Sequence, residues 1–179
     1  MWPPGHLAVA YLLSTGYVRA RVDRPIGAEP VLWLALGSQV PDLVDKPLAW
    51  YVGTLPAGRS LAHSLFVALP LVVLVAALAR RYDRGEAGAA FGIGVLAHVG
   101  VDALPALWDP DATATFLLWP VLTVTQYEGA PSILALFRES LGDPFFLVEL
   151  LLVVLAAAVW YRDGSPGLGT LVRAGRRLG

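Results

Sequence analysis

The stretch Arg59-Ser60-Leu61-Ala62-His63-Ser64-Leu65-Phe66 opens a long apolar run that continues to Ala79. It places a histidine about one turn inside a hydrophobic segment, where an imidazole needs a hydrogen-bond partner or a metal ion. Residues 61–79 are long enough to cross the hydrocarbon core of a bilayer as a helix that rises about 1.5 Å per residue. The stretch therefore predicts a membrane helix with a polar site at one end.

The composition also indicates a membrane protein. Of the 179 residues, 56% are hydrophobic and 15% are charged, and the mean hydropathy is +0.63. A soluble domain carries about a quarter charged residues, and here the apolar residues come in blocks. The net charge of −1 excludes a generally basic nucleic-acid-binding protein. Because the chain has no cysteine, disulfides, a thiolate nucleophile and thiolate metal ligands are excluded as well.

The order of the apolar blocks predicts an all-α fold, a polytopic membrane helix bundle of about five spans. The predicted spans are residues 6–18, 31–40, 61–79, 87–107 and 144–161. Residues 116–124 are broken by Pro120 and favour a re-entrant or interfacial segment, and residues 131–141 have the spacing of an interfacial helix. We expect residues 1–164 to form one membrane-embedded domain and residues 165–179 a flexible, basic cytoplasmic tail.

Arginine groups predict the orientation in the membrane. They follow the first, third and last apolar runs, and the positive-inside rule places such ends on the cytoplasmic side. The expected location is the inner (cytoplasmic) membrane of a cell, with an extracytoplasmic N-terminus and a cytoplasmic C-terminus. Under this threading the polar residues described next all lie at the extracytoplasmic face.

The three histidines recur in similar settings and predict one site together with nearby carboxylates. His6 opens the first run, and His98 lies near the end of the fourth, with Asp102 on the same helical face at i+4. Pro41-Asp42-Leu43-Val44-Asp45 ends the second run, and its i,i+3 spacing puts both carboxylates on one face. Imidazole and carboxylate without sulfur suit zinc, manganese or iron, and we expect zinc. The plainer interpretation is that each residue only makes hydrogen bonds or is solvated at a helix end.

Taken in order, these residues resemble a known family. The set is His6, Gly37-Ser38-Gln39-Val40-Pro41-Asp42-Leu43-Val44-Asp45, Arg59-Ser60-Leu61-Ala62-His63-Ser64-Leu65, His98-x-x-x-Asp102 and Leu118-Trp119-Pro120. It is similar to the YdjM-like family, inner-membrane proteins of bacteria and archaea that are described as metal-dependent hydrolases. That family looks related to the zinc-dependent phospholipase C and P1 nuclease group, helical enzymes that cleave phosphodiesters with clustered metals.

The resemblance implies a set of metal ligands, and this chain differs from the family at one position. It implies that His6, Asp42, His63, His98 and Asp102 are metal ligands, and that Asp45 is a candidate for a further one. Family members often have histidine where this chain has Gly58. One potential ligand is therefore missing, which leaves the number of metal ions open.

The expected function is that of a membrane-bound, metal-dependent hydrolase. A metal-activated water would cleave a phosphoester of a lipid or another amphiphilic substrate at the membrane surface. Asp45 would act as general base, and Arg59 would hold a phosphate oxygen with its planar guanidinium group. The expected partners are the lipid bilayer and this substrate, with no nucleic acid. The oligomeric state stays open.

Two other classes of function stay open at this point. In a non-enzymatic membrane protein, the same residues would form a structural metal site or a hydrogen-bond lock, and the site would be closed. In a transporter, ionisable residues would mark a path through the membrane. Against a transporter, the six candidate residues lie at one face, and only Glu149 lies elsewhere in a predicted span. Glu149 would either pair with Arg138 or reach the site.

Overall fold

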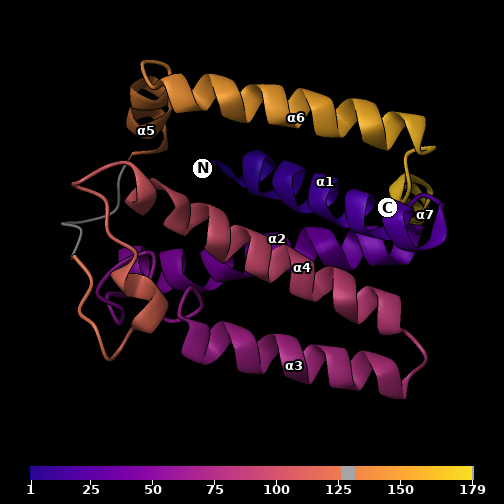
Figure 1. Ribbon diagram of the computed structural model, residues 1–179, viewed down its shortest axis with the longest axis horizontal. Helices are drawn as coiled ribbons and strands as arrows, with labels where there is room; N and C mark the ends of the chain where they lie inside the picture. The colour runs from indigo at the N-terminus through magenta and orange to yellow at the C-terminus, as the bar shows by residue number, and fades with distance from the viewer. Residues whose placement is uncertain (126–131, 179) are drawn as a thin grey trace.

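The computed structural model describes residues 1–125 and 132–178, and every regular element within these ranges is helical (Figure 1). The α-helices are α1 (Pro3–Val22), α2 (Ala28–Pro47), α3 (Leu65–Arg81), α4 (Gly85–Ala103), α5 (Ile133–Ser140), α6 (Pro144–Arg162) and α7 (Leu168–Leu178). The shorter segments are the π-helix η1 (Leu48–Val52) and the 3-10 helices η2 (Leu104–Leu107) and η3 (Thr115–Leu118). The predicted all-α class is confirmed.

Helix α4 lies at the centre of the bundle. It contacts α1, α2 and α3, while α6 packs against α1 on the outside. Figure 1 shows these long helices lying side by side along the long axis of the molecule, with α5 at one end of the bundle and α7 at the other. Residues that are far apart in sequence therefore meet at the helix ends.

Helices α2 and α4 approach each other closely at two glycines. A Cβ atom on Gly37 would lie 2.3 Å from the backbone oxygen of Phe91, and one on Gly94 would lie 2.5 Å from that of Leu34. No side chain fits at such distances, so glycine is what lets the two backbones come together. This contact brings the C-terminal half of α2 beside the last turns of α4.

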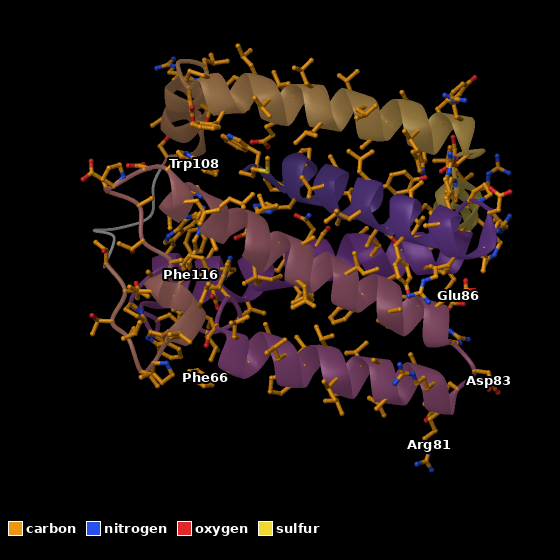
Figure 2. All side chains as sticks on the ribbon, in the orientation of Figure 1. Phe66, Arg81, Asp83, Glu86, Trp108 and Phe116 are labelled. Carbon is orange, nitrogen blue, oxygen red and sulfur yellow. The ribbon has the colours of Figure 1, made fainter. Side chains whose placement is uncertain are left out.

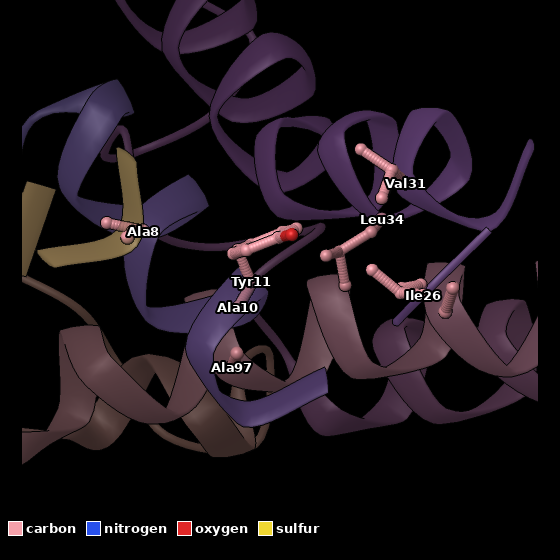
Figure 3. Packing of buried hydrophobic residues seen from close by; sticks show 9 residues of the cluster. Ala8, Ala10, Tyr11, Ile26, Val31, Leu34 and Ala97 are labelled. Carbon is pink, nitrogen blue, oxygen red and sulfur yellow. The ribbon is translucent and has the colours of Figure 1, made fainter. Parts of the chain in front are cut away.

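Small side chains dominate the buried core. In the cluster drawn in Figure 3, Ala8 and Tyr11 of α1 meet Leu34 of α2 and Ala97 of α4. A second cluster joins α3 and α4 to Phe116 of η3. Because most of these side chains are small, the helix axes lie close together, and small shifts of one helix are transmitted to the next.

The outer faces of the bundle are apolar and exposed. Val73 of α3 and Leu151 and Val154 of α6 are 65–70% exposed, and apolar surface of this kind matches lipid better than water. By length and hydropathy, two helical segments of the described chain could cross a membrane, Gly85–Leu107 and Pro144–Arg162. The prediction of about five spans is therefore not confirmed.

Several helix boundaries differ from those predicted. Helix α2 continues past Pro41 to Pro47, so that Asp42 and Asp45 lie inside a helix. Helix α3 begins only at Leu65, because the Ser64 side chain accepts a hydrogen bond from the Phe66 amide and caps the helix. His63 consequently lies in the turn before α3.

The last third of the chain also differs in detail. Helix α5 lies within the predicted interfacial segment, although residue 131 of that prediction is outside the described residues. Residues 168–178, expected as part of a flexible tail, form helix α7. The mobility of this segment stays a prediction.

The two ends of the bundle carry different side chains. Figure 2 shows Arg81, Asp83 and Glu86 at one end, and Trp108 and Phe116 at the other. The C-terminal end of α2, the N-terminal end of α3 and the C-terminal end of α4 all point to the end with Trp108 (Figure 1). The candidate site residues lie on these helix ends.

Candidate metal centre

Four buried side chains converge at this end of the bundle. Asp42 comes from α2, His63 from the turn before α3, and His98 and Asp102 from α4. Each offers a ring nitrogen or a carboxylate oxygen, and these four atoms all lie within 4.8 Å of one another. The two imidazoles are completely buried, whereas Asp42 and Asp102 are 7% and 5% exposed. The group is therefore closed on its histidine side and comes nearest the surface on its carboxylate side.

The distances among these atoms fit a tetrahedral ion site. His63 Nε2 lies 3.2 Å from His98 Nε2, 3.6 Å from Asp42 Oδ1 and 3.4 Å from Asp102 Oδ2. His98 Nε2 lies 3.6 and 3.8 Å from the same two oxygens. A tetrahedron whose ligands lie about 2.1 Å from its centre has edges of about 3.4 Å, so the spacing suits a zinc-sized ion.

Hydrogen bonds on the far side of each imidazole direct the Nε2 atoms to the centre. His98 Nδ1 lies 2.6 Å from the backbone oxygen of Ser38, which can only accept, so this nitrogen carries a proton and donates. His63 Nδ1 lies 2.8 Å from Asp45 Oδ2 and donates in the same way. In the neutral imidazoles both Nε2 atoms then carry lone pairs, and they face two carboxylate oxygens. A cation at the centre would stabilise four electron-rich atoms at these distances.

An unpartnered oxygen supports the same conclusion. Asp42 Oδ1 is buried and has no hydrogen-bond partner within the described residues. A buried carboxylate oxygen without a partner is costly. Coordination of an ion at the centre of the group would satisfy it, and so the residues present fit a bound metal.

Asp45 lies behind His63, away from the Nε2 atom. Its oxygens accept hydrogen bonds of 2.8 Å from the backbone amides of Ser60 and Ala62, in addition to the one from His63 Nδ1. Asp45 is completely buried and is not one of the four converging groups. These contacts favour a role in orienting His63 over the roles expected from the sequence, a metal ligand and a general base.

Two cationic side chains hold the carboxylates from outside. Lys46 Nζ lies 2.5 Å from Asp42 Oδ2, which leaves Oδ1 directed to the centre. Arg59 Nε and Nη2 lie 2.7 and 3.1 Å from the two oxygens of Asp102. Arg59 is therefore at the site, as expected, but its guanidinium group contacts a carboxylate of the site itself. Sequence reasoning missed Lys46, although its position four residues after Asp42 was an available signal.

His6 lies beside the four-residue group and not within it. Its ring stacks on that of His98 with 3.7 Å between centroids, and its Nε2 lies 3.5 Å from Asp102 Oδ1. His6 Nδ1 is buried without a hydrogen-bond partner in the described part of the chain. The structure thus brings every histidine of the chain to one place, with His6 at its edge.

Glu149 of α6 is buried against the start of α1. Its Oε1 accepts a 2.8 Å hydrogen bond from the backbone amide of Trp2. Gly5 leaves room for this carboxylate, because a Cβ atom there would lie 2.4 Å from Oε1. Glu149 therefore fixes the first turn of the helix that carries His6.

A comparison with protein families matches most of the chain. The model of the family described as YdjM inner membrane protein matches residues 1–167. This range contains the four converging residues together with His6, Asp45 and Arg59. No curated protein and no solved structure matches the chain.

Proposed function

The chain belongs to the YdjM inner membrane protein family, and we propose that it is a membrane-bound hydrolase that depends on a divalent metal ion. Asp42, His63, His98 and Asp102 would hold the ion. The observation that carries the proposal is the convergence of two imidazole Nε2 atoms and two carboxylate oxygens, with the imidazole protons on the far side. Such a donor set binds zinc, manganese or iron, and zinc is our first expectation.

A hydrogen-bond lock between helices accounts less well for the same geometry. The nitrogen–oxygen distances across the centre are 3.4–3.8 Å, beyond the usual range of about 2.7–3.2 Å for a hydrogen bond. The one shorter contact joins the two Nε2 atoms and would need an extra proton between them. An ion at the centre would satisfy all four atoms at once.

A divalent ion held by Asp42, His63, His98 and Asp102 would act as a Lewis acid, which lowers the pKa of water and would make a nucleophile available near neutral pH. The chain's own residues orient the site and bind the substrate. Asp45 and the Ser38 carbonyl hold the imidazoles, and the half-exposed Arg59 offers its outer edge to an anionic oxygen. Because the site lies at one end of a membrane bundle, we propose a phosphoester of a lipid or another amphiphile as the substrate.

We also propose the full five-span topology, with the site on the extracytoplasmic face and the C-terminus in the cytoplasm. Helices α1, α2 and α3 have 20, 20 and 17 residues and flank α4, so they could accompany it across a bilayer. A reporter fused after Gly179 should be cytoplasmic, and one inserted within residues 46–58 should be extracytoplasmic. If both lie on the same side, this topology is wrong.

The metal content of the purified protein tests the proposed function, together with a screen of phosphoester substrates. We expect bound metal and hydrolysis in the native chain and loss of both in His63→Ala. Asp163→Asn is the matched control, because Asp163 accepts hydrogen bonds from Tyr11 and Arg19 at the opposite end of the bundle. This control should keep metal and activity.

A structural metal site is the second candidate, since four protein groups can fill a tetrahedral shell. It predicts metal at full stoichiometry without hydrolysis of any phosphoester. Native protein purified without bound metal, and unable to take metal up, would contradict both candidates and favour the hydrogen-bond lock.

A further inference from the structure

Helix α7 has two unlike faces. Its helical spacing puts Leu168, Leu171 and Val172 on one side and Arg173 on the other, with Arg176 at the edge of the apolar side next to Val172. The three apolar side chains are 47%, 57% and 46% exposed. The described part of the bundle therefore leaves about half of this apolar face uncovered. Residues 164–179 contain no acidic residue.

The start of α7 is tied to the end of a helix that could cross a membrane. Helix α6 ends at Arg162, and the connection turns sharply through Gly164 and Gly167, whose φ angles are 82° and 89°. The indole Nε1 of Trp160 donates a 3.0 Å hydrogen bond to the backbone oxygen of Pro166, which holds this turn against α6. Helix α7 consequently lies at the opposite end of the bundle from the metal centre (Figure 1).

We propose that α7 lies in the plane of the membrane surface and binds anionic lipid headgroups. The apolar face would enter the boundary between headgroups and acyl chains, and Arg173 and Arg176 would contact lipid phosphates. The family match ends at residue 167, so helix α7 lies outside the part of the chain that matches the family. It is independent of the metal centre.

The charge and position of α7 favour lipid over a second copy of the chain. A pair of α7 helices packed through their apolar faces would leave Arg173 pointing away from the contact and Arg176 at its edge, and residues 164–179 offer neither arginine an acidic partner. An anionic bilayer surface at the end of α6 offers both an apolar layer and negative charge. One surface thus matches both faces of the helix.

Single-cysteine variants make the proposal testable, because the chain has no cysteine of its own. A spin label at Leu171→Cys or Thr170→Cys would be placed in the full-length protein. The protein would then be reconstituted into nanodiscs of phosphatidylcholine, with or without phosphatidylglycerol. Power-saturation EPR measures how far each label is accessible to oxygen, which concentrates in lipid, and to a water-soluble nickel complex. Thr170 lies on the arginine side, where Arg173 Nη2 lies 3.4 Å from its Oγ1, and is the matched control position.

In anionic discs, the label at position 171 should be accessible to oxygen and shielded from nickel, and the label at position 170 should show the reverse. Replacing Arg173 or Arg176 by glutamine should each shift the equilibrium between surface-bound and free α7 about fivefold toward the free helix.

Three outcomes would overturn the proposal. A label at 171 that nickel reaches in both lipids would place α7 in water, and one that neither reagent reaches would show that protein covers it. Equal results with and without phosphatidylglycerol would exclude headgroup recognition.

Discussion

Replacing Gly94 by alanine should separate α2 from α4 and weaken the metal centre. The added Cβ atom would lie 2.5 Å from the backbone oxygen of Leu34 and 2.7 Å from the backbone nitrogen of Ser38. Ordinary van der Waals contact begins at 3.4 Å. The two backbones must therefore move apart by the difference between 3.4 and 2.5 Å, about 0.9 Å, because both clashing atoms belong to the main chain.

This displacement acts directly on a proposed ligand. His98 Nδ1 donates its hydrogen bond to the Ser38 oxygen across the α2–α4 contact, at 2.6 Å, and an increase of about 0.9 Å would break it. Metal sites tolerate errors of only about 0.2 Å in ligand distance. Loss of the group that orients a ligating histidine costs about 10–100-fold in metal affinity. Overpacking also lowers the free energy of unfolding by about 1–3 kcal/mol.

Gly100→Ala is the matched control on the same helix. Among the described residues, a Cβ atom at this position meets nothing within 4 Å, and alanine stabilises a helix by about 1 kcal/mol relative to glycine. Metal affinity, measured by competition with a chelator, should fall in Gly94→Ala and stay unchanged in Gly100→Ala. The Tm in detergent should fall only in the first variant. Native affinity and Tm in Gly94→Ala would refute the argument that this close approach sets the geometry of the site.

Three further predictions concern the groups around the site and the tail. Asp45→Asn should weaken metal binding about 10–100-fold in the chelator assay, because the carboxylate that orients His63 is lost; native affinity would exclude the orienting role. Lys46→Met should lower metal affinity about tenfold by freeing Asp42, and Lys46→Arg should restore most of it. An equal loss in both variants would show that the charge on residue 46 is not what matters. Deletion of residues 165–179 should leave the metal content unchanged by elemental analysis, whereas a large loss would assign the tail to the site.

Much of the fold follows from the sequence because each apolar block must leave water as a helix that satisfies its own backbone. The blocks at 87–107 and 144–161 correspond to α4 and α6, which are also the segments long and apolar enough to cross a membrane. Their mean hydropathy decides this without any knowledge of packing. The amphipathic spacing after residue 131 likewise predicted a short helix near the observed α5.

The sequence alone also predicted that the site residues come together. His98 and Asp102 share a helical face by their spacing, and arginines at the other helix ends predicted that the histidines meet at one face. The structure places His6, His63 and His98 together at one end of the bundle. Spacing along the chain was enough for this, because it sets both the end of a helix and the face on which a side chain lies.

The division of roles among these residues depends on the tertiary structure alone. Asp42 and Asp45 share a helix, yet Asp42 points to the centre while backbone amides and His63 Nδ1 take up the oxygens of Asp45. Periodicity gives the face of a helix, but it does not give the rotation, depth and separation of two packed helices, which here depend on backbone contact at Gly37 and Gly94. A ligand and the residue that orients it differ by only a few ångströms, and distances of that size are decided by packing between helices.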